Sequence, residues 1–250
     1  AGTYGGGLVK FTKDKIIKYP LPSTSVASQQ ILTLTFDAKG LLWVGTQNNK
    51  IWKFNGEQFI PAAQDKIPPG SISDLFFDDK ERLWIATPFG FGYLQNDKFK
   101  LIKSNEFTWN FLQKGKDSVI ITTMNHLYLF TKDSCTIISQ NERIGKSDVT
   151  GIVKGKDGNF WLMTNGYGIL IWNLQLDSVM ENITTKDGLN SDFIYNIKVD
   201  KDGNFWIGTG AGINRIAYQE GFEKYKIFKY GKAEGMFGQE SNKSAVMQNK

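Results

Sequence analysis

The stretch DKDGNFWIGTGAGINRI, from Asp200 to Ile216, decides the fold of this 250-residue chain. It joins a charged turn, a short apolar run around Trp206, a small Gly/Thr-rich turn and a second short run. A calcium-binding loop does not fit, because Gly203 stands at the fourth position rather than the sixth and the twelfth is Ala211, which has no carboxylate. A dinucleotide-binding loop does not fit either, because these glycines lie between two short strands and open no helix.

The stretch instead recurs along the chain. A near twin, GKDGNFWLMTNGYGILIW, occupies 155–172, and further copies are DAKGLLWVGTQNNKIWKF at 37–54 and DDKERLWIATPFGFGYL at 78–94. The usual spacing is roughly forty residues, and a weaker copy, SVIITTMNHLYLF at 118–130, fills the one gap of about twice that length. The chain also begins inside a copy, GTYGGGLVKF at 2–11, which matches only the back half of the pattern.

Each period contains about four short runs with alternating apolar and polar residues, rich in Val, Ile, Phe, Tyr and Thr, and helix signals are nearly absent. The pattern predicts an all-β chain, a β-propeller of four-stranded antiparallel blades, with about six blades' worth of sequence from a seven-bladed ring. A linear β-solenoid is the alternative. In each blade the Asp-Gly segment is expected to form the first hairpin turn. Trp206 is expected to pack between neighbouring blades.

The predicted organisation follows the repeats. Propeller repeats cover 1–235: a partial first blade at 1–20, then blades at about 29–65, 71–103, 107–140, 148–185 and 192–231. Residues 236–250 are expected to begin a closing blade before a following module.

Composition limits the function classes. The chain is 40% hydrophobic and 14% aromatic, which supports a sizeable core. Its net charge is only +5 and its basic residues are scattered, so we expect no nucleic-acid partner. No apolar run approaches the roughly 18–20 residues of a membrane span, so we expect no membrane contact by this segment. The chain starts at Ala1 without a signal-like segment, and we expect an excised or processed piece of a longer protein.

The stretch GLNSDFIYNIKVDKDGNFWIGTGAGINRI, 188–216, resembles the two-component regulator propeller repeat, and the resemblance extends over about 1–235. The tail GMFGQESNKSAVMQNK, 235–250, resembles the stretch that opens the last blade in that family. The resemblance implies a periplasmic sensor propeller of a hybrid two-component system, with a membrane span and a histidine kinase elsewhere in the parent receptor. It further implies sensing of carbohydrate or oligosaccharide ligands, and it allows a homodimer formed through the parent receptor.

No residue pattern indicates catalysis in this segment. The one histidine, His126, lies in the turn of the weakest copy, and we expect a surface role. Cys135 lies in a predicted outer strand and is expected to be a small packing residue that forms no internal disulfide. We find no Cys/His cluster with metal spacing and expect no metal or cofactor. The enzyme alternative is a streptogramin-type lyase, a propeller with related repeats that needs a catalytic His and Glu.

A ligand-binding role is therefore favoured, with the site on the loops. Amides bind sugar hydroxyls and aromatic rings stack on pyranose faces. The alternatives are that Asn and Gly only form the turns, or that the propeller is a protein-interaction scaffold without a small ligand. The candidates lie in turns between second and third strands, in an inter-blade loop, or on first strands expected to line a central channel: Asn48, Phe89, Asn125, His126, Asn165, Tyr167, Asp192, Trp109 and Tyr195.

Overall fold

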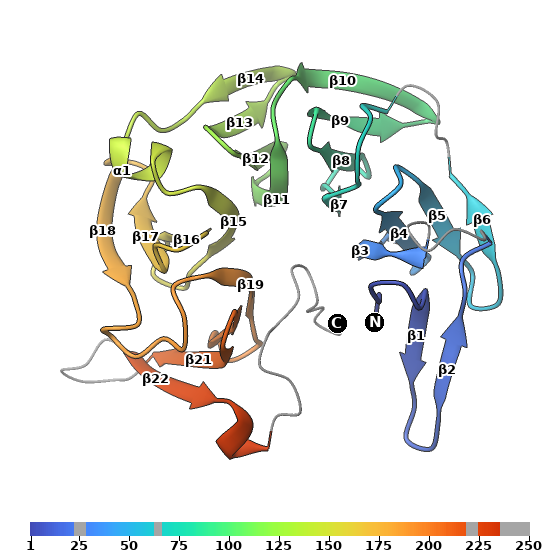
Figure 1. Ribbon diagram of the computed structural model, residues 1–250. Coiled ribbons are helices and arrows are strands. Elements are labelled where there is room, and N and C mark those ends of the chain that lie inside the picture. Colours follow the sequence, from blue (N-terminus) through green and yellow to red (C-terminus); the bar gives the residue numbers. More distant parts are fainter. Residues whose placement is uncertain (23–28, 63–66, 219–224, 236–250) are drawn as a thin grey trace. The chain divides into compact units, whose positions relative to one another are not determined.

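The computed structural model describes residues 1–22, 29–62, 67–218 and 225–235 (Figure 1). These residues form two compact units: unit 1 contains 1–123 and 129–136, and unit 2 contains 124–128 and the described residues from 137 onward. Short antiparallel strands dominate both units. Within the described ranges the helical elements are one turn of α-helix, α1 (Glu142–Gly145), and one 3-10 turn, η2 (Lys232–Glu234).

Five four-stranded antiparallel sheets, called blades 1 to 5, succeed one another along the chain, each ordered as in the sequence. Blade 1 contains β3 (Ile31–Phe36), β4 (Leu42–Thr46), β5 (Ile51–Phe54) and β6 (Phe59–Pro61). Blade 2 contains β7 (Asp74–Phe77), β8 (Leu83–Thr87), β9 (Gly90–Gln95) and β10 (Lys98–Ser104). Blade 3 contains β11 (Thr108–Gly115), β12 (Ser118–Thr123), β13 (Leu127–Thr131) and β14 (Ser134–Ile137).

Unit 2 contains the last two blades. Blade 4 consists of β15 (Val149–Lys154), β16 (Phe160–Thr164), β17 (Ile169–Asn173) and β18 (Ser178–Ile183). Blade 5 consists of β19 (Ile194–Val199), β20 (Phe205–Thr209), β21 (Gly212–Tyr218) and β22 (Tyr225–Tyr230). The predicted architecture of four-stranded antiparallel blades is therefore confirmed.

The predicted number of blades needs correction. The described residues form five complete blades, not six or seven, and a two-stranded sheet of β1 (Leu8–Phe11) and β2 (Ile16–Tyr19). This hairpin corresponds to the third and fourth strands of a blade, because the sequence contains only the back half of that copy. The segment predicted to begin a closing blade, 236–250, lies outside the described residues.

Within each unit, neighbouring blades contact one another through their first strands. In unit 1, β7 contacts both β3 and β11, and in unit 2, β15 contacts β19. The carboxylate of Asp74 on β7 joins three of these strands. One oxygen accepts a hydrogen bond from Thr33 Oγ1 at 3.2 Å, and the other accepts one from Asn110 Nδ2 at 2.9 Å. A bond to a charged acceptor contributes about 1.5–3 kcal/mol, so this bridge helps hold three blades in register.

The repeated tryptophan is buried by an aromatic residue of the following blade. The ring centroids of Trp43 and Phe77 are 5.5 Å apart, and those of Trp84 and Phe111 are 5.6 Å apart. In unit 2, Trp161 stacks on Phe205 with centroids 3.8 Å apart. Trp84 and Trp161 are fully buried and Trp43 nearly so. Such pairs add about 0.5–1.5 kcal/mol beyond the burial of apolar area, so they stabilise the blade-to-blade packing.

Trp206 departs from the prediction that it packs between neighbouring blades. Its side chain is 36% exposed, and its ring stacks on Tyr230 of its own sheet at 5.8 Å. The neighbouring Phe205 makes the packing contact with blade 4 instead. The physical reason is strand alternation: Phe205 and Trp206 point to opposite faces of blade 5, and the described residues contain no blade after it.

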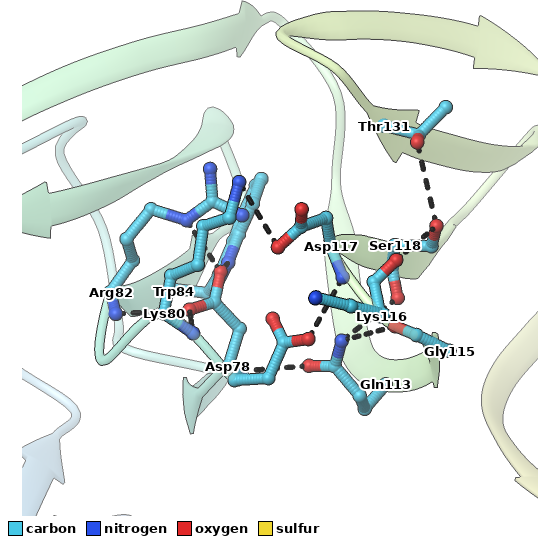
Figure 2. Close-up of polar contacts among 11 residues, drawn as sticks. Asp78, Lys80, Arg82, Trp84, Gln113, Gly115, Lys116, Asp117, Ser118 and Thr131 are labelled. Carbon is cyan, nitrogen blue, oxygen red and sulfur yellow. Dashed lines mark hydrogen bonds and ion pairs between the residues drawn. The ribbon is translucent and has the colours of Figure 1, made fainter.

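A carboxylate in the first turn of a blade fixes the tryptophan. The indole Nε1 donates to Asp37 in blade 1 at 3.1 Å and to Asp78 in blade 2 at 2.7 Å. Figure 2 shows the second case, in which Asp78 also accepts a hydrogen bond from Arg82 Nε at 2.6 Å. This ion pair is almost completely buried. Gly155 stands at the corresponding position of blade 4.

The first turns of blades 2 and 3 are also joined to each other, as Figure 2 shows in part. The Asp117 backbone N–H donates to the Asp79 carboxylate at 2.8 Å, and the Asp79 N–H donates to Gln113 Oε1 at 3.2 Å. Lys80 Nζ lies 3.0 Å from Asp117 Oδ1. These acidic turn residues therefore join two neighbouring blades.

Candidate functional site

The turn between the second and third strands is built around a buried threonine. In blade 4, Thr164 Oγ1 donates to the Gly168 carbonyl and accepts a hydrogen bond from the Tyr167 N–H at 3.0 Å. Thr87 and Thr209 make the same pair of bonds in blades 2 and 5. This explains the marker threonine of the repeat, because its hydroxyl satisfies two backbone groups that the tight turn leaves unpaired.

Gly168 completes the turn in blade 4. Its φ is +74°, and a Cβ placed on it would lie 2.2 Å from the Ile183 carbonyl oxygen. The outer strand thus approaches the backbone at a distance that only glycine allows. The backbone that carries the Tyr167 side chain is therefore held on one side by Thr164 and on the other by Gly168.

Three residues of this turn contact the loop that enters blade 5. The N–H groups of Gly166 and Gly168 both donate to the Asp192 carbonyl, at 3.2 and 2.9 Å. A β-bridge joins Asn165 to Phe193. On its other side, Asn165 Nδ2 donates to Asp148 Oδ2 at 3.1 Å. These contacts hold together two loops that are distant in sequence, so that they form one surface.

Two aromatic rings project from this surface into solvent. Tyr167 is 53% exposed and Phe193 is 50% exposed. A Cβ on Gly166 would lie 3.4 Å from the Phe193 ring, so the phenyl group lies against the turn that carries Tyr167. We call Asn165, Tyr167, Asp192 and Phe193 the unit 2 aromatic cluster. Half-exposed rings held on a rigid backbone are well placed to stack on a flat ligand.

Sequence reasoning selects three of these four residues. It misses Phe193, because that position reads as an ordinary strand residue. The available signal is the position of Phe193 relative to the strand. Ile194 and Ile197 are buried strand residues, so Phe193, just before the strand begins, lies at the end of the inter-blade loop.

The Asp192 carboxylate stabilises the loop that carries it. Its carboxylate accepts hydrogen bonds from the Thr185 N–H at 2.7 Å and from Thr185 Oγ1 at 3.2 Å. This carboxylate ties the entry loop of blade 5 to the segment that leaves blade 4.

Trp109 and Tyr195 occupy equivalent places. Each comes directly after the first residue of the inner strand of its blade, where the register of β11 with β12 and of β19 with β20 shifts. Both side chains are half-buried. Trp109 lies 4.4 Å from the Phe107 ring, centroid to centroid. A bulge re-aims side chains locally. Whether these two face a channel stays a prediction.

The remaining candidates lie apart from the unit 2 aromatic cluster in sequence. Asn48 uses its side-chain oxygen to accept a hydrogen bond from Thr46 Oγ1 at 2.7 Å, so it is part of its own turn. Phe89 resembles Tyr167, because it comes after Thr87 in the blade 2 turn and is 54% exposed. Asn125 is exposed, and His126 Nδ1 lies 3.4 Å from the hydroxyl oxygen of Tyr128.

The described residues contain no metal-binding cluster, and their one cysteine is a weak acid. Among them, no group of three or more His, Cys, Asp and Glu side chains is arranged to hold a metal ion. Cys135 lies on β14, and burial raises the pKa of its thiol to about 11, which leaves it a poor nucleophile at neutral pH. Over the described ranges, no helix has the length and apolar character that crossing a membrane would need.

Comparison with known proteins agrees with this architecture. The chain is a β-propeller with four-stranded antiparallel blades. Residues 188–211, which include the stretch around Trp206, match the model of the two component regulator propeller, so the resemblance seen in the sequence is confirmed there. A search of curated proteins found no match.

Solved structures with the same fold include two extracellular domains from B. thetaiotaomicron, both described as belonging to hybrid two component systems. One is 20% identical with a TM-score of 0.70 and the other 17% identical with 0.66. Each match covers 84% of this chain, but only 29% of the first solved chain and 32% of the second. A catalytically inactive variant of virginiamycin B lyase from Staphylococcus aureus, solved with quinupristin, is 16% identical with a TM-score of 0.74 over 96% of this chain and 81% of that one. At these identities the likeness concerns the fold alone.

Proposed function

We propose that this chain is part of the extracytoplasmic, periplasmic sensor propeller of a two-component signalling receptor, and that it binds a carbohydrate. Two findings support the sensor class. A repeat of the two component regulator propeller type lies at 188–211, and extracellular domains of hybrid two component systems share the fold. The kinase and the membrane anchor of such a receptor would lie in other parts of the parent protein.

The unit 2 aromatic cluster carries the ligand proposal. Tyr167 and Phe193 expose about half of each ring at fixed turns. Aromatic rings stack on the apolar faces of pyranoses, and the Asn165 amide beside them is suited to bind hydroxyl groups. Turn formation accounts for the glycines and the asparagine, but it does not account for two large exposed rings.

Calorimetric titration with a panel of oligosaccharides tests this proposal. We expect Tyr167→Ala and Phe193→Ala each to weaken binding at least tenfold. Leu176→Ala is the matched control, because Leu176 is also highly exposed but lies in the β17–β18 turn. Its substitution should leave binding unchanged. If no saccharide binds while a protein partner does, the domain is an interaction scaffold and the ligand proposal fails.

The fold likeness to virginiamycin B lyase favours one second candidate, a lyase-like propeller enzyme. The histidine that this candidate would use is His126, the one histidine of the sequence, whose Nδ1 lies 3.4 Å from the Tyr128 hydroxyl oxygen. The test is turnover of a streptogramin substrate. Turnover that disappears in His126→Ala would establish this candidate, whereas a chain with no turnover would exclude it.

A further inference from the structure

The turn between the second and third strands of blade 5 lacks a side chain that the same turn has in the other blades. The residue directly after the marker threonine is Gln47, Pro88, Met124 and Asn165 in blades 1 to 4. In blade 5 this residue is Gly210. In blade 4 the corresponding side chain belongs to the unit 2 aromatic cluster, so the gap in blade 5 falls at a position that carries a candidate ligand contact next door.

The geometry of the turn does not require glycine at position 210. Gly212, two residues later, has a φ of +120°, and a Cβ on it would lie 2.6 Å from the Tyr230 carbonyl oxygen. Gly210 has no left-handed conformation. The nearest atoms to a Cβ on Gly210 would belong to side chains, with the Tyr195 hydroxyl oxygen at 3.3 Å and Ser191 Oγ at 3.6 Å. A side chain at position 210 would therefore occupy a place beside two hydroxyl groups.

Both of these hydroxyl groups have hydrogen-bonding capacity left for a ligand. The Tyr195 ring is half-buried at the register shift of β19 with β20, but its hydroxyl oxygen is not buried and forms no hydrogen bond within the described part of the chain. Ser191 Oγ accepts a hydrogen bond from the Phe193 N–H at 3.1 Å, which leaves its own proton available. We call Ser191 and Tyr195 the hydroxyl pair.

The hydroxyl pair adjoins the exposed Phe193 ring. The Gly210 N–H donates to the Phe193 carbonyl at 3.2 Å, and the Phe193 N–H donates to Ser191 Oγ. The backbone of Phe193 is thus bonded to the glycine on one side and to one member of the pair on the other. A sugar ring stacked on Phe193 would have its hydroxyl groups close to the hydroxyl pair.

We propose that the hydroxyl pair determines which saccharide the chain selects, by exchanging hydrogen bonds with one hydroxyl group of the sugar that stacks on Phe193, and that Gly210 keeps the place of this group free. The inference rests on the proposed function. A sugar hydroxyl both donates and accepts, and the pair offers donors as well as acceptors. Such a site rejects an analogue that lacks the hydroxyl group, because its own polar groups are then left unpaired.

Calorimetric titration with deoxy sugars tests the proposal. The probes are the oligosaccharide of the panel that binds the natural chain and its set of monodeoxy analogues. We expect one analogue to bind about tenfold more weakly than the parent sugar. Tyr195→Phe should weaken binding of the parent by a similar factor, but it should not weaken binding of that analogue further, because both changes remove the same hydrogen bond. Gly210→Ala should also weaken the parent, because its methyl group contacts the Tyr195 hydroxyl.

Gly115→Ala is the matched control for the added methyl group. Gly115 has no left-handed conformation either, a Cβ on it would meet nothing within 4 Å, and it ends the first strand of blade 3. We expect this variant to bind the parent sugar as the natural chain does.

The outcomes separate this inference from the proposed function. If binding falls in Phe193→Ala but not in Tyr195→Phe, the inference is overturned and the proposed function stands. If the natural chain binds no saccharide, both are overturned. The decision does not require Gly210→Ala to fold, because Tyr195→Phe removes a single oxygen atom that has no partner within the described residues.

Discussion

Trp206 Nε1 donates a hydrogen bond to Asp200 Oδ2 at 2.9 Å, across the first turn of blade 5. The same residue spacing and the same bond recur between Trp43 and Asp37 and between Trp84 and Asp78. The bond therefore does not depend on burial of the indole, because it forms in blade 5 where the ring remains partly exposed. The carboxylate orients the ring within its own blade, and the next blade then packs on a surface that is already formed.

This relationship predicts a pH dependence. Partial burial works to raise the pKa of Asp200, but hydrogen bonds from Asn204, Trp206 and the Asp202 N–H outweigh it and hold the pKa at about 2. Because the folded pKa is depressed, the stabilisation is fully present above the unfolded value of about 4 and is lost as the pH falls from about 4 towards 2. Urea unfolding between pH 5 and pH 2 should show this loss in the natural chain and a smaller one in Asp200→Asn.

The matched control is Asp202→Asn. Its carboxylate lies in the same turn but makes no hydrogen bond within the described part of the chain, so the pH dependence should be that of the natural chain. An unchanged acid response in Asp200→Asn would show that other carboxylates dominate the acid transition.

The two tryptophans of unit 2 should differ sharply on truncation. Trp161→Ala removes a fully buried ring that stacks on Phe205, and large-to-small changes of this kind cost about 3–5 kcal/mol of unfolding free energy. Trp206→Ala removes a ring that stacks on Tyr230 and donates to Asp200 within its own blade, and we expect a cost of about 1–2 kcal/mol. Chemical denaturation of the two variants under one buffer condition measures the difference. Equal losses would mean that Trp206 is covered in solution.

The sequence was sufficient to predict the blades, because the repeated residues act locally. The marker threonine and the first-turn aspartate each bond within a few residues of their own position, so their spacing reveals the fold without knowledge of distant contacts. The exposure of Trp206 depends instead on whether another blade covers its side of blade 5. No local pattern encodes that contact, and within the described residues Trp206 is accordingly not covered as predicted.

The candidate site was less accessible to sequence reasoning. Tyr167 was found because a large ring in a turn is unusual, whereas Phe193 joins the same surface through a bridge to Asn165 that no spacing reveals. Trp109 and Tyr195 are candidates because of their place on first strands. The register shifts that set their direction arise from pairing with the second strand.

Two glycines allow the cost of a left-handed backbone to be measured apart from the cost of a steric clash with a neighbouring strand. Gly168 and Gly158 have similar φ values of +74° and +82°. A Cβ on Gly168 would lie 2.2 Å from the Ile183 carbonyl oxygen, whereas a Cβ on Gly158 would meet nothing within 4 Å. Gly158→Ala should therefore cost only the left-handed penalty of about 1–2 kcal/mol.

Gly168→Ala should cost more than this by about a further 2 kcal/mol, because the outer strand must move away from the turn. Thermal unfolding of both variants gives the comparison. If the two variants lose equal stability, β18 is not held against the turn as tightly as the structure indicates.

Thr164 should couple the stability of blade 4 to the position of Tyr167. Thr164→Val keeps the shape of the side chain but leaves the Tyr167 N–H and the Gly168 carbonyl without their hydroxyl partner, at a cost of about 1–3 kcal/mol. Thr164→Ser retains the hydroxyl and should lose much less. Hydrogen exchange at the Tyr167 amide measures the local effect, and we expect it to accelerate in the valine variant but not in the serine variant. If the turn also positions Tyr167 for a saccharide, affinity should fall in the same order, and a valine variant with rapid exchange but full affinity would separate the turn from the binding site.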